Sequence, residues 1–145
     1  LGGEGKAVYY EALTKEKAEN IFFAAPAPKG ERFKLYLATP AVFEGGWLPH
    51  WLDGGELTGE YCGIKLRLLA AAVGKYLHVG GFDIKKNQPK IMRRAVPAGS
   101  VYYMEIISGD MAEAIKVFHR VNLSDYDSYA AQGFGLTLVG GVGND

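Results

Sequence analysis

The sequence lacks several features that would define its chemistry directly. Cys62 is the single cysteine among 145 residues, so the sequence contains no internal disulfide and no metal site built from several cysteines. Its longest apolar run, Leu68 to Val73, is far shorter than the roughly 20 residues that a membrane-spanning helix needs. No secretory signal pattern is present. We therefore expect no membrane partner and a cytoplasmic location.

The chain also lacks an excess of charge and the common nucleotide motifs. Lys and Arg number 16, as do Asp and Glu, which gives a formal net charge of zero. A domain that binds nucleic acid alone usually has a pI above about 9, so we expect RNA or DNA contacts only through a local patch. No GxxxxGK[ST] or HExxH motif occurs, and the acidic residues of segment 44–60 match no metal-binding loop. We expect no cofactor and no metal.

Glycine, in contrast, is abundant, and two glycine pairs lie near the end of the chain. Its 20 residues are nearly twice the usual share of about 7%. Glycine pairs at Gly133/Gly135 and Gly140/Gly141 flank a short apolar run. One interpretation is a helix C-cap followed by a strand; the other is a backbone surface that holds a phosphate chain or a partner strand. The helix–glycine–strand order excludes a dinucleotide-binding GxGxxG, which needs the reverse order.

Hydrophobic periodicity predicts strands along most of the chain and helices near its end. Asp110 followed by Glu113 predicts a capped helix, and a short helix is expected from Ser124 to Gly133. Residues 15–20 are expected as a short helix or a loop, and residues 44–59 as a long irregular insertion. The expected strands are 6–13, 32–37, the first half of 64–73, 76–82, 100–107 and 134–139. This pattern predicts an α+β fold with a mainly antiparallel sheet and helices on one face.

The segment from Lys85 to Arg94 is the most basic in the chain, with five positive charges and no negative one. It is either a solvated loop or a loop that contacts phosphates through Lys85, Lys86, Lys90, Arg93 and Arg94. Tyr102 and Tyr103 follow it and could stack on bases, although a position in the strand core explains at least one of them better.

Two other residue types have competing interpretations. Trp47 and Trp51 in the irregular segment either anchor a protein partner or pin the segment to its own core. His119 could serve as a general base for RNA cleavage, because histidine titrates near neutral pH; a structural histidine is the alternative.

Several segments together resemble the RAMP superfamily of CRISPR proteins, specifically the third subunit of the type III-B Cmr effector complex. They are Leu1–Gly5, Leu37–Phe43, Gly80–Asp83, Arg94–Tyr103 and Gly133–Leu136 with Gly140. The resemblance implies one RAMP-type domain over residues 1–145, the C-terminal part of a longer chain, with a ferredoxin-like (RRM-like) sheet and long loop insertions. It also implies that the glycine-rich loop lies near a CRISPR guide RNA.

We accordingly expect RNA contacts at Lys6, at the basic segment and at Gly133, Phe134, Gly135 and Gly140. Ala131 and Gln132 precede the glycines where relatives often have a basic residue, so phosphates there would be held by backbone N–H groups or by cations from other loops. The resemblance implies a non-catalytic subunit docked on the large polymerase-like subunit and on neighbouring RAMP subunits. The alternatives are a metal-independent endoribonuclease that uses His119 and a purely protein-binding scaffold.

Overall fold

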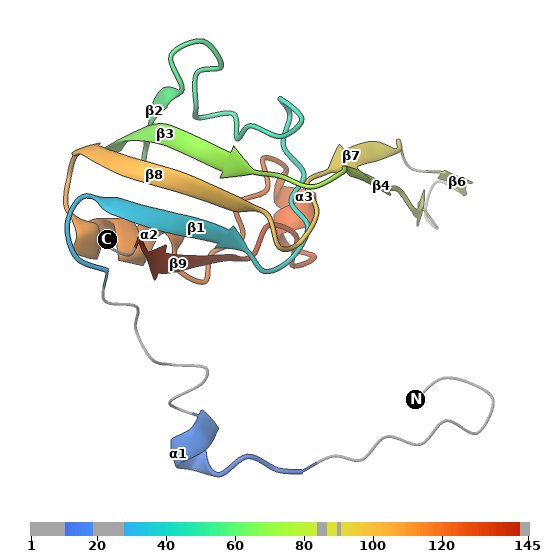
Figure 1. Ribbon diagram of the computed structural model, residues 1–145. Helices are drawn as coiled ribbons and strands as arrows, with labels where there is room; N and C mark the ends of the chain where they lie inside the picture. Colours follow the sequence, from blue (N-terminus) through green and yellow to red (C-terminus); the bar gives the residue numbers. More distant parts are fainter. Residues whose placement is uncertain (1–10, 19–27, 84–86, 90, 143–145) are drawn as a thin grey trace.

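A five-stranded antiparallel sheet forms the centre of the computed structural model, which describes residues 11–18, 28–83, 87–89 and 91–142. Its strand order is β2-β3-β8-β1-β9, and every neighbouring pair is antiparallel (Figure 1). The strands are β1 (Arg32–Leu37), β2 (Thr58–Tyr61), β3 (Ile64–Ala72), β8 (Val101–Ser108) and β9 (Thr137–Gly141). The predicted α+β class with a mainly antiparallel sheet is confirmed.

A narrow arm of two small hairpins leaves the end of the sheet where β3 ends (Figure 1). In the arm, β4 (Leu77–Val79) pairs with β7 (Arg93–Ala95), and β5 (Phe82–Asp83) pairs with β6 (Gln88–Pro89). Three helices are present in the described residues: α1 (Lys15–Ala18), α2 (Met111–Phe118) and α3 (Asp127–Ala130). None of these helices is long and apolar enough to cross a membrane.

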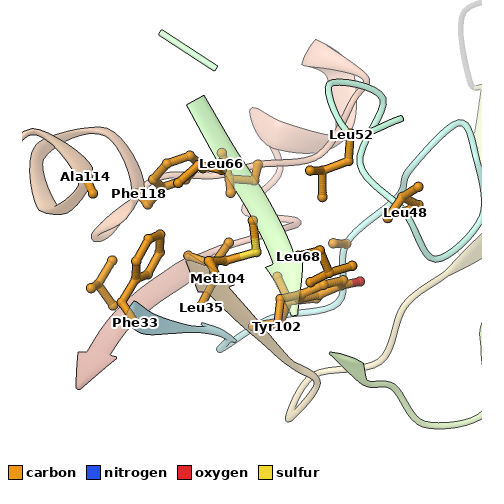
Figure 2. Packing of buried hydrophobic residues seen from close by; sticks show 14 of the residues in the cluster. Phe33, Leu35, Leu48, Leu52, Leu66, Leu68, Tyr102, Met104, Ala114 and Phe118 are labelled. Atoms are coloured by element: carbon orange, nitrogen blue, oxygen red, sulfur yellow. The ribbon is translucent and has the colours of Figure 1, made fainter. Parts of the chain in front are cut away.

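Alternation of apolar and polar residues makes one face of the sheet the core. In β1, Phe33, Leu35 and Leu37 are buried while the residues between them are not. Side chains of β3 and β8 continue this face, and Phe118 and Ala114 of α2 close it at one end (Figure 2). Because burial of each large apolar side chain contributes roughly 1.5–3 kcal/mol, this alternation fixes which face of the sheet points inward.

The capped helix predicted after Asp110 is confirmed as α2. The Glu113 N–H donates to the Asp110 carboxylate at 2.8 Å, and the Asp110 N–H donates to the Glu113 carboxylate at 3.3 Å. This reciprocal pair satisfies backbone donors that the first turn of a helix leaves free. Helical spacing then places Ala114 and Phe118 on the buried side.

Several boundary predictions were wrong, and β3 continues through Ala72 rather than ending in the first half of residues 64–73. The second helix, α3, begins at Asp127 and has no side-chain cap, because the Ser124 hydroxyl instead accepts a hydrogen bond from the Val42 N–H at 3.1 Å. β9 begins at Thr137 rather than Phe134, since the preceding residues form a turn. Of the strand expected over 6–13, residues 11–13 have no regular structure, and the remainder lies outside the described residues.

The predicted irregular segment is confirmed, and residues 44–57 cover part of the core without a helix or a regular strand. Leu48 and Leu52 of this segment are buried against the sheet (Figure 2). The Asp125 carboxylate holds the segment in place by accepting from the Glu44 N–H at 2.8 Å and from the His50 N–H at 3.1 Å. It also lies 2.7 Å from His50 Nδ1.

Candidate nucleic-acid interface

Arg93 and Arg94, which end the basic segment, lie on β7, and each is placed over a tyrosine ring. The Arg93 guanidinium carbon is 3.9 Å from the centre of the Tyr126 ring, and the Arg93 Nη1 donates to the Tyr126 hydroxyl at 2.7 Å. The Arg94 guanidinium carbon is 4.7 Å from the centre of the Tyr76 ring. Stacking orients a guanidinium group while leaving several of its five donors available. We call these four residues the arginine–tyrosine site.

A hollow of about 270 Å³ lies beside Arg94, at the base of the arm. Its wall combines aromatic and aliphatic side chains with two cations: Trp47, Val73, Lys75, Tyr76, Arg94 and Val96. Aromatic rings and arginine planes are the groups on which unstacked RNA bases stack. The hollow therefore offers both a surface for a flat ring and cations for an adjoining phosphate.

A second hollow of about 300 Å³ lies beside Arg93, and Gly46 and Arg94 border both hollows. Its wall includes Tyr126 and the apolar side chains of Ile91 and Met92, which are 77% and 66% exposed. Exposed apolar groups next to arginines are typical of surfaces that contact a macromolecule rather than solvent. The two hollows thus form one continuous candidate surface around Arg94.

The sequence analysis did not predict a role for Tyr76 or Tyr126, the two tyrosines of the arginine–tyrosine site. Tyr76 precedes β4, and β4 pairs with β7 so that His78 lies opposite Arg94; a hairpin prediction for residues 77–95 would have brought Tyr76 near Arg94. Tyr126 lies 33 residues from Arg93 in sequence. No local pattern connects these two residues, because their contact depends on the packing of the turn before α3 against the arm.

The positions of the other predicted RNA-binding cations relative to this site are not described. Lys6, Lys85, Lys86 and Lys90 lie outside the described residues, so their contacts with RNA stay predictions. Of the basic segment, the structure therefore places Arg93 and Arg94.

The glycine turn (Gly133–Leu136) uses its backbone donors within the chain. The N–H groups of Gly133, Phe134 and Gly135 donate to the carbonyls of residues 130, 129 and 40, at 2.9, 3.1 and 2.7 Å. The Leu136 N–H donates to the Thr39 hydroxyl at 2.8 Å. Each of these donors therefore already has a partner within the chain, and RNA contact at Gly133 and Gly135 stays a prediction.

Two of these glycines are required by the path of the chain. Gly133 and Gly135 have φ values of +87° and +83°, which residues with a Cβ rarely adopt. A Cβ at Gly135 would lie 2.6 Å from the Ser124 backbone nitrogen, whereas one at Gly133 would meet nothing within 4 Å. The close approach at Gly135 is therefore to the protein's own backbone. Gly133 ends the turn after α3, as expected of a helix C-cap.

Phe134 and Gly140 have different surroundings. The Phe134 ring contacts the Tyr129 ring edge-on, with 5.4 Å between ring centres. Gly140 lies on β9 opposite Lys34 of β1, with open space where a side chain would be. These surroundings do not join either residue to the arginine–tyrosine site, and their proximity to RNA stays a prediction.

The two tryptophans have separate roles. Trp51 packs between Tyr61 and Phe118, with ring centres 5.3 and 5.6 Å away, so it pins the irregular segment to the core as the alternative interpretation proposed. Trp47 is 44% exposed and lines the first hollow. The Trp47 carbonyl accepts from the buried Tyr102 hydroxyl at 2.5 Å, which fixes the backbone that carries the exposed ring.

His119 is held as a structural residue. The Val139 N–H donates to its Nδ1 at 3.1 Å, and its Nε2 is buried without a partner among the described residues. Burial, with a smaller effect of Arg120, lowers the pKa of His119. A general base must offer an unprotonated nitrogen to its substrate, and here the accepting nitrogen already faces β9.

The acidic residues of the irregular segment do not form a ligand cluster. Asp53 accepts from the Gly55 and Glu56 N–H groups at 2.9 and 2.8 Å, and these hydrogen bonds lower its pKa. Across the part of the chain that the structure describes, no group of three or more His, Cys, Asp or Glu residues could hold a metal ion.

Comparison with known families identifies a match over nearly the whole chain. The model of a family of CRISPR-associated proteins, Cas_Cmr3, matches residues 1–142, which is almost the whole chain. No curated protein matches this sequence. The family match confirms the resemblance drawn from the dispersed sequence segments.

Proposed function

Because this chain belongs to the Cas_Cmr3 family of CRISPR-associated proteins, we propose that it is a non-catalytic, RNA-holding domain of a type III-B Cmr effector complex. In this role it binds the 5′ region of the CRISPR guide RNA. It also docks on the large polymerase-like subunit and on neighbouring RAMP subunits. Its place as the C-terminal part of a longer subunit, and its cytoplasmic location, belong to the same proposal.

The observation that carries the RNA assignment is the pair of arginines stacked on tyrosines at the border of two hollows. Arginine contacts phosphates through paired donors and also presents a flat face to a base. Tyr76 adds aromatic surface beside Arg94. This combination suits a single-stranded segment whose bases are unstacked, the form in which proteins usually read RNA.

The topology supports a ferredoxin-like RAMP domain. We count β1, β3, β8 and β9 as the four strands of a β–x–β–β–α–β sequence, in which x is a connection without a helix. The order β9-β1-β8-β3 then places the first strand between the fourth and the third. The connection from β8 to β9 contains α2, as a ferredoxin-like unit requires. The connection from β1 to the β2–β3 hairpin is the irregular segment, which takes the position of the first helix. Compared with the ferredoxin-like pattern, this domain has a loop that carries Trp47 at the position of the first helix.

The partner assignment rests on apolar side chains that are exposed around the two hollows. Trp47, Ile91 and Met92 are each more than two-fifths exposed, and aromatic residues and methionine are enriched in the cores of protein interfaces. We assign Trp47 to partner contact and withdraw Trp51, whose ring is used by the core. In the assembled complex, RNA and a neighbouring subunit would then meet at the base of the arm.

The non-catalytic assignment is supported by the surroundings of His119, whose accepting nitrogen is occupied by Val139. The endoribonuclease alternative predicts that a labelled guide precursor is cleaved by the complete protein and that His119→Ala abolishes cleavage. A purely protein-binding scaffold predicts instead that no RNA contact depends on Arg93 or Arg94. Incubation with the labelled precursor tests the endoribonuclease alternative, and the experiment described next tests the scaffold alternative.

The test compares guide-RNA binding by the assembled complex with and without Arg93→Ala/Arg94→Ala, over a range of salt concentrations. Loss of two phosphate contacts to a single strand should reduce the slope of log K against log salt by about 1.4. The matched control is Lys116→Ala, which removes an exposed cation from α2 on the main body of the domain, away from the arm (Figure 1). Unchanged affinity and slope in the double variant, with the complex intact, would refute the RNA assignment.

A further inference from the structure

The face of the sheet opposite the core carries two tyrosines on its two central strands. Tyr36 of β1 is 42% exposed, and Tyr103 of β8 is partly exposed, whereas its neighbour Tyr102 is in the core. Strand register places Lys34 opposite Tyr103 and Tyr36 opposite Val101. The tyrosines are therefore diagonal neighbours, a spacing of about 7–8 Å in an antiparallel pair.

Small residues flank this pair on the outer strands. The row through Tyr103 continues to Ala70 of β3 on one side and, across Lys34, to Gly140 of β9 on the other. The row through Tyr36 includes Ala72 and Leu138. In this row β3 and β9 contribute Ala70 and Gly140, and Tyr103 is partly exposed, with the Lys34 ammonium group over its ring.

The adjoining row supplies positive charge. Arg32 and Arg67 lie on either side of Glu105, with nitrogen–oxygen distances of 2.9 and 3.3 Å, and the ammonium nitrogen of Lys34 lies 5.7 Å from the centre of the Tyr103 ring. These rows contain three cations and one carboxylate, although the whole chain is neutral. The positive charge is thus concentrated next to the exposed rings.

We propose that this face is a second RNA-binding surface, on which bases of a single strand stack against Tyr103 and Tyr36 while its phosphates lie along Lys34, Arg32 and Arg67. Four-stranded sheets with aromatic residues on their central strands bind RNA in this manner. The inference rests on the proposed function and extends it from the arm to the sheet. The tyrosine end of the face is continuous with the arm, because Ala72 is followed directly by Val73 and Gly74 of the first hollow.

The charged residues of this surface, rather than the exposed apolar side chains of Leu69 and Ile107 on the same strands, favour RNA over a protein partner. Cores of protein interfaces are depleted in Lys and Glu, yet here Lys34 and Glu105 occupy the two central strands beside the tyrosines. A phosphate chain, in contrast, matches the excess of cations. Stacking on the rings then adds affinity that does not depend on salt or on base identity.

The test measures guide-RNA affinity of the assembled complex that contains the complete protein with Tyr36→Ala/Tyr103→Ala. Loss of base stacking should weaken binding about fivefold or more for each tyrosine, with the salt dependence unchanged because no charge is removed. The matched control, Tyr36→Phe/Tyr103→Phe, keeps the rings and should retain the affinity. Thermal unfolding of both variants checks that the sheet is intact.

The outcomes separate this inference from the proposed function. Normal affinity of the alanine variant in an intact complex overturns the second surface while leaving the arginine–tyrosine site in place. If Tyr36→Ala/Tyr103→Ala prevents the protein from entering the complex while its own RNA binding stays normal, the second RNA-binding surface is overturned in favour of a protein interface. If Arg93→Ala/Arg94→Ala is also without effect, the proposed RNA function itself fails.

Discussion

The glycine turn and the two arginines of the arginine–tyrosine site were both predicted to contact RNA, yet they use their polar groups in opposite ways. The glycine turn directs its backbone donors inward, to residues 39, 40, 129 and 130. The arginine–tyrosine site presents guanidinium groups and rings at the border of two hollows. Glycine abundance in this chain therefore reflects, at least at Gly135, close approach of the chain to itself. Binding chemistry is concentrated where side chains, not backbone, are exposed.

The largest expected difference in stability is between alanine variants of the two tryptophans, because Trp51 packs in the core and Trp47 is exposed. Trp51→Ala should lower the free energy of unfolding by about 3–5 kcal/mol, because it removes a ring packed on Tyr61 and Phe118 and leaves a cavity. Trp47→Ala should cost less than about 1 kcal/mol, since its ring is 44% exposed. Chemical denaturation of both variants measures this difference. Equal losses would mean that Trp47 also belongs to the core.

The two glycines of the turn give a smaller contrast. Gly135→Ala should destabilise the protein by about 3 kcal/mol, because the new methyl group meets the Ser124 backbone and the φ angle is strained. Gly133→Ala has the strained angle alone and should cost about 1–2 kcal/mol. Thermal unfolding measures both values. A Gly135→Ala variant as stable as Gly133→Ala would contradict the close packing of the turn.

Replacing the arginines by lysines tests how the arginine–tyrosine site contributes. Arg93→Lys/Arg94→Lys keeps both charges but loses the planar faces stacked on Tyr126 and Tyr76. We expect a several-fold loss of guide-RNA affinity, with the salt dependence retained. Filter binding of the assembled complex at several salt concentrations measures both quantities. Full affinity in this variant would indicate that charge alone acts here.

The smallest expected effect concerns pH. Burial lowers the pKa of His119 in the folded protein, so the folded state binds fewer protons than the unfolded state. Stability conferred by the neutral ring should then decline as the pH falls below the ordinary histidine pKa of about 6.5. His119→Asn should show a shallower decline in melting temperature between pH 7.5 and 5.5. Parallel declines in the two proteins would contradict the assignment of this acid sensitivity to His119.

Much of the fold could be predicted because it depends on local patterns. Alternation in residues 32–37 gave β1, and the pair Asp110 and Glu113 gave α2. The start of α3 could not be predicted, because the Ser124 hydroxyl accepts a hydrogen bond from the N–H of Val42, 82 residues away, and does not cap the helix. Tertiary hydrogen bonds of this kind override a local capping signal.

The candidate site was predictable in part for the same reason. A run of basic residues indicated Arg93 and Arg94, since charge clustering is visible along the chain. The contact of Arg93 with Tyr126, the hollow beside Trp47 and the inward donors of the glycine turn all depend on segments distant in sequence. The family resemblance placed the glycine turn near RNA, and no local pattern shows that Thr39 and Pro40 accept hydrogen bonds from its donors.

The most direct test of the account is RNA–protein crosslinking in the intact complex, mapped to residues of this chain. A guide RNA with photoreactive bases in its 5′ region should crosslink to peptides that contain Tyr76, Arg93–Arg94 or Tyr126, and these crosslinks should be lost in Arg93→Ala/Arg94→Ala. Crosslinks confined to other subunits, with none to the base of the arm, would contradict the proposal that this domain holds the guide.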